Sequence, residues 1–159
     1  MTEISFIVPE KEDLLLNGQA MSIAPKGDKW LKSCLADYAN ERGVYIHHNG
    51  IEILYVGQTV KGKWGTFSER LRREFQETSS QNNRLHKFLY EEAKISGIKT
   101  VCFSLNEIEE RVNGEPSKLS NENKALIFEQ LLIGIFQPKG NRSGIFENSE
   151  LVVAVTSDS

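Results

Sequence analysis

The feature that most constrains the fold of this chain is a pair of strand-like segments on either side of Asn49-Gly50. Residues 44–48 and 51–58 are rich in β-branched, aromatic and other apolar side chains. Asn-Gly between two such segments predicts a two-residue β-hairpin turn, because both residue types tolerate positive φ. Alternation along the second strand predicts two faces, made of Ile51, Ile53 and Tyr55 on one side and of Leu54 and Val56 on the other.

After the hairpin the apolar pattern changes to helical spacing. Thr66 and Glu69 form a capping-box signature, so a helix is predicted to begin there. Its buried stripe comprises Phe67, Leu71 and Phe75. The later predicted elements are a helix over residues 82–96, a strand over 100–105, a loop over 106–119 and an apolar helix over 121–136. Gly97 and Pro138 are the predicted stop signals of the two later helices.

This order of elements predicts an α+β fold, with a small three-stranded, mostly antiparallel sheet flanked by helices. The predicted organisation is an N-terminal extension (1–41) packing on the core, a domain (42–142) and a C-terminal tail (143–159). Residues 4–8 of the extension alternate like a short strand that Pro9 ends. Residues 30–38 have apolar side chains at helical spacing behind Asp28, which predicts a helix.

Composition narrows the class of protein further. The 159 residues are 39% hydrophobic and 26% charged, as in ordinary globular proteins. No apolar segment approaches the roughly 20 residues of a membrane helix, and the first residues lack the layout of a signal peptide. We therefore expect a cytoplasmic protein with no membrane partner. Cys34 and Cys102 are expected to be reduced thiols, and the three histidines do not form a zinc pattern.

Charge is unevenly distributed along the chain. The net charge of −3 argues against a nucleic-acid partner when taken alone. Residues 60–100, however, hold nine Lys or Arg against five Glu, a balance of +4, so the rest of the chain carries −7. A basic middle is compatible with a local phosphate site, although such segments are also commonly solvated surface.

A set of motifs then gives the chain a resemblance. Gly43-Val44-Tyr45, followed after nine residues by Tyr55-Val56-Gly57-Gln58-Thr59, resembles the signature of the GIY-YIG endonuclease family. Three further elements follow in the family's order: the helix segment from Glu69 to Phe75, Asn83 to Leu85, and Glu129-Gln130 followed by Pro138 and Asn141. The resemblance covers roughly residues 42–142. It implies a GIY-YIG nuclease-like fold and a metal-dependent DNA endonuclease.

The resemblance also implies a role for five residues. Tyr45 would act as general base on a water molecule, and Tyr55 would orient water or phosphate. Arg70 would stabilise charge on the phosphoryl transition state. Glu129 would bind Mg²⁺ (or Mn²⁺), and Asn141 would support the phosphate or a metal-bound water.

Physical chemistry gives independent reasons to examine three of these residues. A tyrosine base needs a nearby cation or metal, because its ordinary pKa is about 10. Helical phase predicts that Arg70 flanks the buried stripe, whereas Arg73 lies nearly opposite it and faces solvent. Glu129 lies among apolar helical neighbours, where a carboxylate is costly unless it is paired or binds a metal. The alternative for Arg70 is an ordinary surface arginine. The alternative for Glu129 is a side chain that reaches solvent or forms an ion pair.

Two features depart from the family pattern. Many members carry a His or Tyr four residues after the arginine, where this chain has Glu74. Glu74 cannot act as a neutral imidazole base, so we expect either a second acid near the metal or altered catalysis. The loop with Lys61, Lys63 and Trp64 is longer than the minimal family loop, and its lysines with Arg72 are predicted DNA contacts.

Three functions are compatible with these observations. The first is a site-specific endonuclease of restriction-like or mobile-element type, hydrolysing DNA phosphodiesters with a metal. The second is a structure-selective repair or recombination nuclease. The third is a catalytically degenerate domain that binds DNA or protein. The sequence shows no recognisable second DNA-binding module, so a homodimer would fit the first function.

Overall fold

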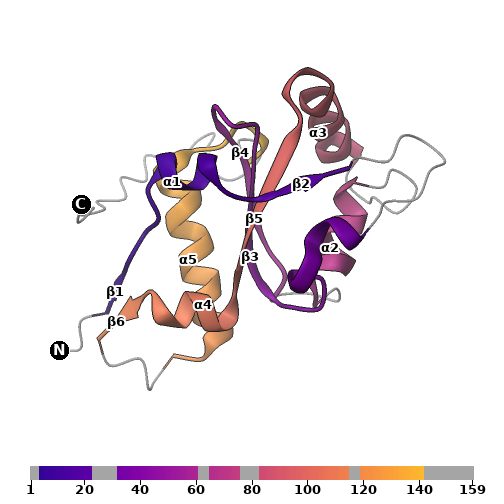
Figure 1. The fold of residues 1–159 in the computed structure, drawn as a ribbon. Helices are drawn as coiled ribbons and strands as arrows, with labels where there is room; N and C mark the ends of the chain where they lie inside the picture. The colour runs from indigo at the N-terminus through magenta and orange to yellow at the C-terminus, as the bar shows by residue number, and fades with distance from the viewer. Residues whose placement is uncertain (1–3, 23–31, 61–64, 76–82, 115–118, 142–159) are drawn as a thin grey trace.

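The structure is a computed structural model that describes residues 4–22, 32–60, 65–75, 83–114 and 119–141 (Figure 1). Its β-strands are β1 (Ser5–Phe6), β2 (Gln19–Met21), β3 (Gly43–His48), β4 (Ile53–Gln58), β5 (Ile98–Ser104) and β6 (Val112–Asn113). Its α-helices are α1 (Lys11–Leu16), α2 (Phe67–Phe75), α3 (Asn83–Ser96), α4 (Leu105–Glu110) and α5 (Asn121–Phe136). The 3-10 segments are η1 (Lys32–Tyr38) and η4 (Lys139–Asn141). No helix in these ranges is long and apolar enough to cross a membrane.

The main sheet has the strand order β2-β5-β3-β4, and every pairing in it is antiparallel. The predicted α+β class is confirmed, but the sheet has four strands rather than three. The additional strand, β2, comes from the predicted N-terminal extension and pairs with β5. A separate two-stranded sheet joins β1 to β6. β3 is therefore a central strand, whereas β4 lies at an edge of the main sheet.

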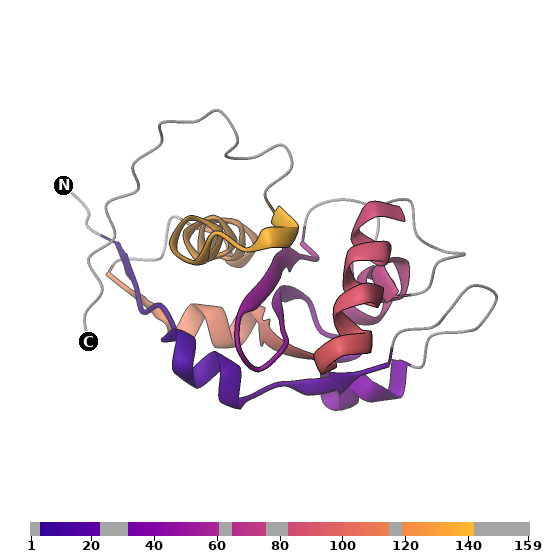
Figure 2. The same ribbon diagram turned by 90° about the horizontal axis from the view of Figure 1, so that it is seen from above.

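Helices cover both faces of the main sheet. Figure 1 shows α1, α4 and α5 on one side and α2 and α3 on the other, and Figure 2 shows the strands passing between α5 and α3. Each side has its own buried apolar cluster. The cluster under α5 includes Val44, Ile46, Val56, Ile108, Phe128 and Leu132. The cluster under α2 and α3 includes Tyr45, Leu54, Phe67, Leu71, Phe75 and Leu89. Alternation along β3 thus directs Tyr45 to the α2 side.

The hairpin differs from its prediction in two ways. The turn is longer than two residues, because Asn49 Oδ1 accepts hydrogen bonds from the backbone N–H groups of Ile51 and Glu52, and the first pair is His48 with Ile53. A β-bulge follows, because His47 pairs with Tyr55 and leaves Leu54 as an extra residue. The prediction that Ile53 and Tyr55 share a face is therefore wrong, since a bulge reverses the alternation.

The helices that carry functional candidates begin and end close to their predicted positions. Thr66 Oγ1 accepts from the backbone N–H of Glu69 before α2, and the predicted stripe of α2 is buried. Ser120 caps α5, and Gln137 ends it in the left-handed conformation just before Pro138. The predicted loop over residues 106–119 is wrong for its first part. Ser104 and Glu107 form a complete capping box there, which starts α4.

The predicted helix over residues 30–38 is only partly described. Asp28, Trp30 and Leu31 lie outside the described residues, as does the predicted tail (143–159). The described part is not an α-helix, because η1 consists of 3-10 turns joined at Ala36, whose φ is 51°. Leu35 from this segment is nevertheless buried in the cluster under α2.

Candidate active site

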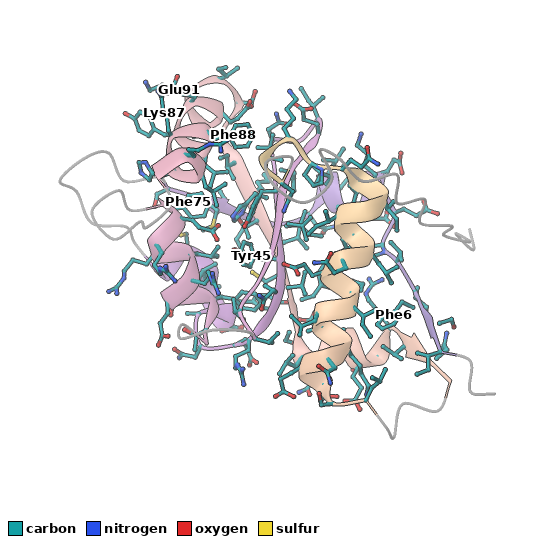
Figure 3. All side chains as sticks on the ribbon, turned by 180° about the vertical axis from the view of Figure 1, so that it is seen from behind. Phe6, Tyr45, Phe75, Lys87, Phe88 and Glu91 are labelled. Carbon is teal, nitrogen blue, oxygen red and sulfur yellow. The ribbon has the colours of Figure 1, made fainter. Side chains whose placement is uncertain are left out.

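The candidate site is built around Tyr45, a fully buried side chain of the central strand β3. Figure 3 shows Tyr45 at the middle of the sheet, on the side where Phe75 projects from α2. Its register partner on β4 is Gly57. A Cβ atom at Gly57 would lie 2.3 Å from Tyr45 Oη and 2.4 Å from Cζ, so the ring occupies the space a side chain would fill. The Gly of the second motif therefore makes room for the Tyr of the first.

Gly57→Ala should consequently displace the ring of Tyr45. We expect a loss of stability of about 1–3 kcal/mol from overpacking, measured by thermal or denaturant unfolding, together with a loss of any catalytic activity. Gly65→Ala is the control, because a Cβ there would meet only Arg42 Nε, at an ordinary 3.7 Å. Equal stability of the two variants would show that the ring of Tyr45 does not pack over β4 at Gly57.

Tyr45 belongs to a buried hydrogen-bond network that includes Glu74 of α2. Tyr45 Oη donates to Glu74 Oε2. His47 Nε2 lies 2.9 Å from Glu74 Oε1, and His47 Nδ1 lies 2.7 Å from Thr100 Oγ1. All four side chains are buried. The network therefore connects β3, α2 and β5 in the interior of the protein.

His47 and Thr100 were missed by the sequence analysis. His47 lies two residues after Tyr45, so strand alternation puts both side chains on the α2 face, and this signal was available. Thr100 is the register partner of His47 on β5, and only the pairing of the strands reveals that. Glu74 was recognised as a departure from the family pattern, but its contacts with Tyr45 and His47 were not predicted.

Tyr55 lies beside this network at the edge of the sheet. Its ring centroid is 6.2 Å from that of Tyr45, so the two tyrosines lie close together on the α2 side of the sheet. It also stacks on His47 at 5.9 Å with an interplanar angle of 20°. Burial raises the pKa of Tyr55, and the negative charges of Glu74 and Glu129 raise it further, while Arg70 opposes them. Three charged groups from two helices therefore act on one ring.

The pKa of Tyr45 is also raised well above its ordinary value. Burial is the main cause, the charge of Glu74 and the neighbouring Tyr55 add to it, and Arg70 again acts in the opposite direction. The phenol therefore keeps its proton and donates it in a hydrogen bond to Glu74. A Tyr45 that accepts a proton from water must give up its own proton to another group.

The exposure of the three arginines of α2 agrees only in part with the exposure that helical phase predicts. Arg70 is half-buried, as helical phase predicted. Arg73 is half-buried as well, and Arg72 is the exposed one, so the prediction that Arg73 faces solvent is wrong. Helical phase locates only the side of α2 that faces the sheet, whereas α3 also packs against α2. Lys61 and Lys63 lie outside the described residues.

Asn141 lies at the open edge of β4. Its Oδ1 accepts from the backbone N–H of Val56 and its Nδ2 donates to the carbonyl of Val56, both at 2.9 Å. Gly140 also lies close to the backbone of β4, because a Cβ atom at Gly140 would be 2.7 Å from the carbonyl oxygen of Leu54. The side chain of Asn141 therefore forms hydrogen bonds with the backbone of the edge strand β4 at the residue after Tyr55. Its contact with phosphate or water stays a prediction.

Glu129 is half-buried on α5, the helix that packs against β3 and β4. Its Oε1 accepts a hydrogen bond from Gln130 Nε2 at 3.2 Å. Among the described residues, no group of three or more His, Cys, Asp or Glu could hold a metal ion. A site that relies on several protein ligands does not fit these residues. Hydrated Mg²⁺ does fit, because it keeps several waters and needs only one or two carboxylates besides a phosphate.

Comparisons with known protein families, with curated proteins and with solved structures found no match to this chain. The resemblance to the GIY-YIG family therefore depends on the motif residues and their order alone.

Proposed function

We propose that this protein is a GIY-YIG-type endonuclease, which hydrolyses DNA phosphodiester bonds with a divalent metal. The observation that carries the proposal is the group of charges around Tyr55. Arg70 and Glu74 from α2 and Glu129 from α5 all act on this ring, which also contacts Tyr45. Two phenols, one guanidinium and two carboxylates beside an edge strand are chemically suited to phosphodiester hydrolysis.

In this proposal each side chain has a separate task. The guanidinium of Arg70 binds a phosphate oxygen and stabilises the charge that develops during attack. The hydroxyl group of Tyr45 accepts a proton from the attacking water, and that of Tyr55 orients the water or the phosphate. Glu129 is the residue that would hold Mg²⁺ (or Mn²⁺). When bound, the metal supplies Lewis-acid stabilisation of the phosphate and the leaving oxygen.

The partners follow from the same chemistry. DNA is the proposed substrate, and exposed Arg72 with Lys61 and Lys63 would contact its backbone. Site-specific cutting by a cytoplasmic homodimer is the finer form of the proposal, because two copies of one domain present a longer recognition surface than one copy does.

A cleavage assay tests the proposal directly. The chain is incubated with supercoiled plasmid and, separately, with branched DNA, in Mg²⁺ or in excess chelator. We expect nicked or linear products that require the metal. Discrete fragments support a site-specific enzyme, and cutting only at branches supports the structure-selective alternative. DNA that is bound but remains intact in Mg²⁺ and in Mn²⁺ would contradict the nuclease proposal and support a degenerate binding domain.

A further inference from the structure

Glu74 has a distinctive environment for an acidic side chain. It is only 6% exposed, and each of its carboxylate oxygens has its own partner. Oε2 accepts from Tyr45, and Oε1 meets His47. A buried carboxylate is costly unless it is fully hydrogen-bonded, and these contacts reduce that cost. Both oxygens of Glu74 therefore already have hydrogen-bond partners within the protein.

The direction of the hydrogen bonds follows from the chemistry of the groups. An ionised carboxylate can only accept, so both Tyr45 Oη and His47 Nε2 donate to Glu74. For a neutral imidazole, Nδ1 then accepts from the hydroxyl of Thr100, at 2.7 Å. Thr100 therefore fixes the tautomer of His47, and His47 fixes the position of the carboxylate. Tyr45 and His47 therefore donate to Glu74 directly, and Thr100 donates to His47 behind it.

We propose that Glu74 receives the proton of Tyr45 when water attacks the phosphate, and that His47 and Thr100 are positioning residues for Glu74. The inference rests on the proposed nuclease function and adds a residue role to it. It also accounts for the departure at this position, because a carboxylate beside Tyr45 can accept a proton as an imidazole would.

The proposed step balances in atoms and charge. The water oxygen forms a bond to phosphorus, and its proton moves to Tyr45 Oη. The original phenolic proton of Tyr45 moves at the same time to Glu74 Oε2. The bond from phosphorus to the leaving sugar oxygen breaks, and that oxygen takes a proton from solvent. Glu74 returns its proton through Tyr45 to solvent after the product leaves, so no oxidant or further reactant is needed.

The charged and titratable groups around this pair come from four elements. β3 contributes His47, β4 contributes Tyr55 and α2 contributes Arg70, while Glu129 of α5 acts on the neighbouring Tyr55. The positive charge of Arg70 acts to lower the pKa of Tyr45, so it favours partial phenolate character during the transfer. The acid-base behaviour of the site is therefore expected to depend most directly on which residue occupies position 74.

The test compares Glu74→Gln and Glu74→His with the wild-type chain, and uses Glu69→Gln, an exposed change on the same helix, as the control. Glu74→Gln cannot accept the proton, so kcat should fall by about 10²-fold or more, while Glu69→Gln stays near wild type. Glu74→His restores a proton acceptor. It should retain activity, with the acidic limb of its pH–rate profile about two pH units higher, because histidine has the higher ordinary pKa.

The positioning role of Thr100 is tested by Thr100→Val, which keeps the shape and removes the hydroxyl. Loss of one hydrogen bond should lower kcat by about fivefold with little change in KM. A circular-dichroism melt establishes that each variant is folded. An unchanged kcat in Thr100→Val would overturn the positioning role.

The remaining outcomes separate this inference from the proposed function. If the wild-type chain cuts DNA and folded Glu74→Gln cuts equally fast, the proton transfer to Glu74 is wrong and the nuclease proposal stands. The transfer is equally wrong if Glu74→His is active with an unchanged acidic limb. If the wild-type chain does not cut DNA with Mg²⁺ or Mn²⁺, the nuclease proposal fails, and the inference fails with it.

Discussion

Glu129→Gln is expected to eliminate Mg²⁺-dependent DNA cleavage while the melting temperature of the chain stays level or rises. The side chain is half-buried on α5, where the residues three and four positions away on either side are apolar, and its negative charge acts on Tyr55. Partial burial penalises the charged form, so glutamine keeps the shape and removes an unfavourable charge. DNA should still bind, and more tightly, because a carboxylate no longer faces phosphate. The measurements are a melting curve, a binding titration and a cleavage assay on the same variant.

Glu122→Gln provides a matched control for this substitution. Glu122 lies on the same helix, and its carboxylate is 3.8 Å from Arg42 in a surface ion pair, so its loss should leave cleavage near wild type. Cleavage by Glu129→Gln at close to the wild-type rate would mean that the proposed metal site is wrong. Unfolding of Glu129→Gln would instead identify Glu129 as half of a structural ion pair, and the nuclease proposal would lose its main physical support.

The part of the candidate site that depends on local pattern was predictable from the sequence. Alternation and the Asn-Gly turn signal indicate the two strands of the hairpin on which Tyr45 and Tyr55 lie. The stripe of α2 follows from helical periodicity. These signals depend only on residues that are close along the chain, so they hold even where the predicted contacts between distant elements are wrong.

The part that depends on long-range packing was not predictable. The extra residue at Leu54 is set by the turn that Asn49 stabilises, and it decides which face Tyr55 occupies. The network at Glu74 requires β3, β5 and α2 to meet, and their contributing residues are separated by 27 and 53 positions from His47. A single sequence shows that such residues exist, but it does not show that they touch.

The second large effect is expected at Arg70. Arg70→Ala should lower kcat by on the order of 10²–10³-fold, as for the loss of one preorganised charge contact in a transition state. The reason is electrostatic, because the positive charge of Arg70 acts on both Tyr45 and Tyr55 and lowers the pKa of each against the effect of burial. Removing it should leave the phenols less able to accept a proton and the phosphate without its cation.

Arg73→Ala is the control for Arg70→Ala, because Arg73 lies on the same helix and is also half-buried. Because Arg70 is the residue whose positive charge lowers the pKa of both tyrosines, we expect a much smaller fall in kcat for Arg73→Ala. Binding titrations at several salt concentrations separate weaker DNA binding from slower chemistry. Equal losses of kcat in the two variants would show that the guanidinium of Arg70 has no special place at the tyrosines. A loss in Arg70→Ala that Arg70→Lys partly restores would assign the effect to positive charge, with the remainder due to the planar geometry of the guanidinium.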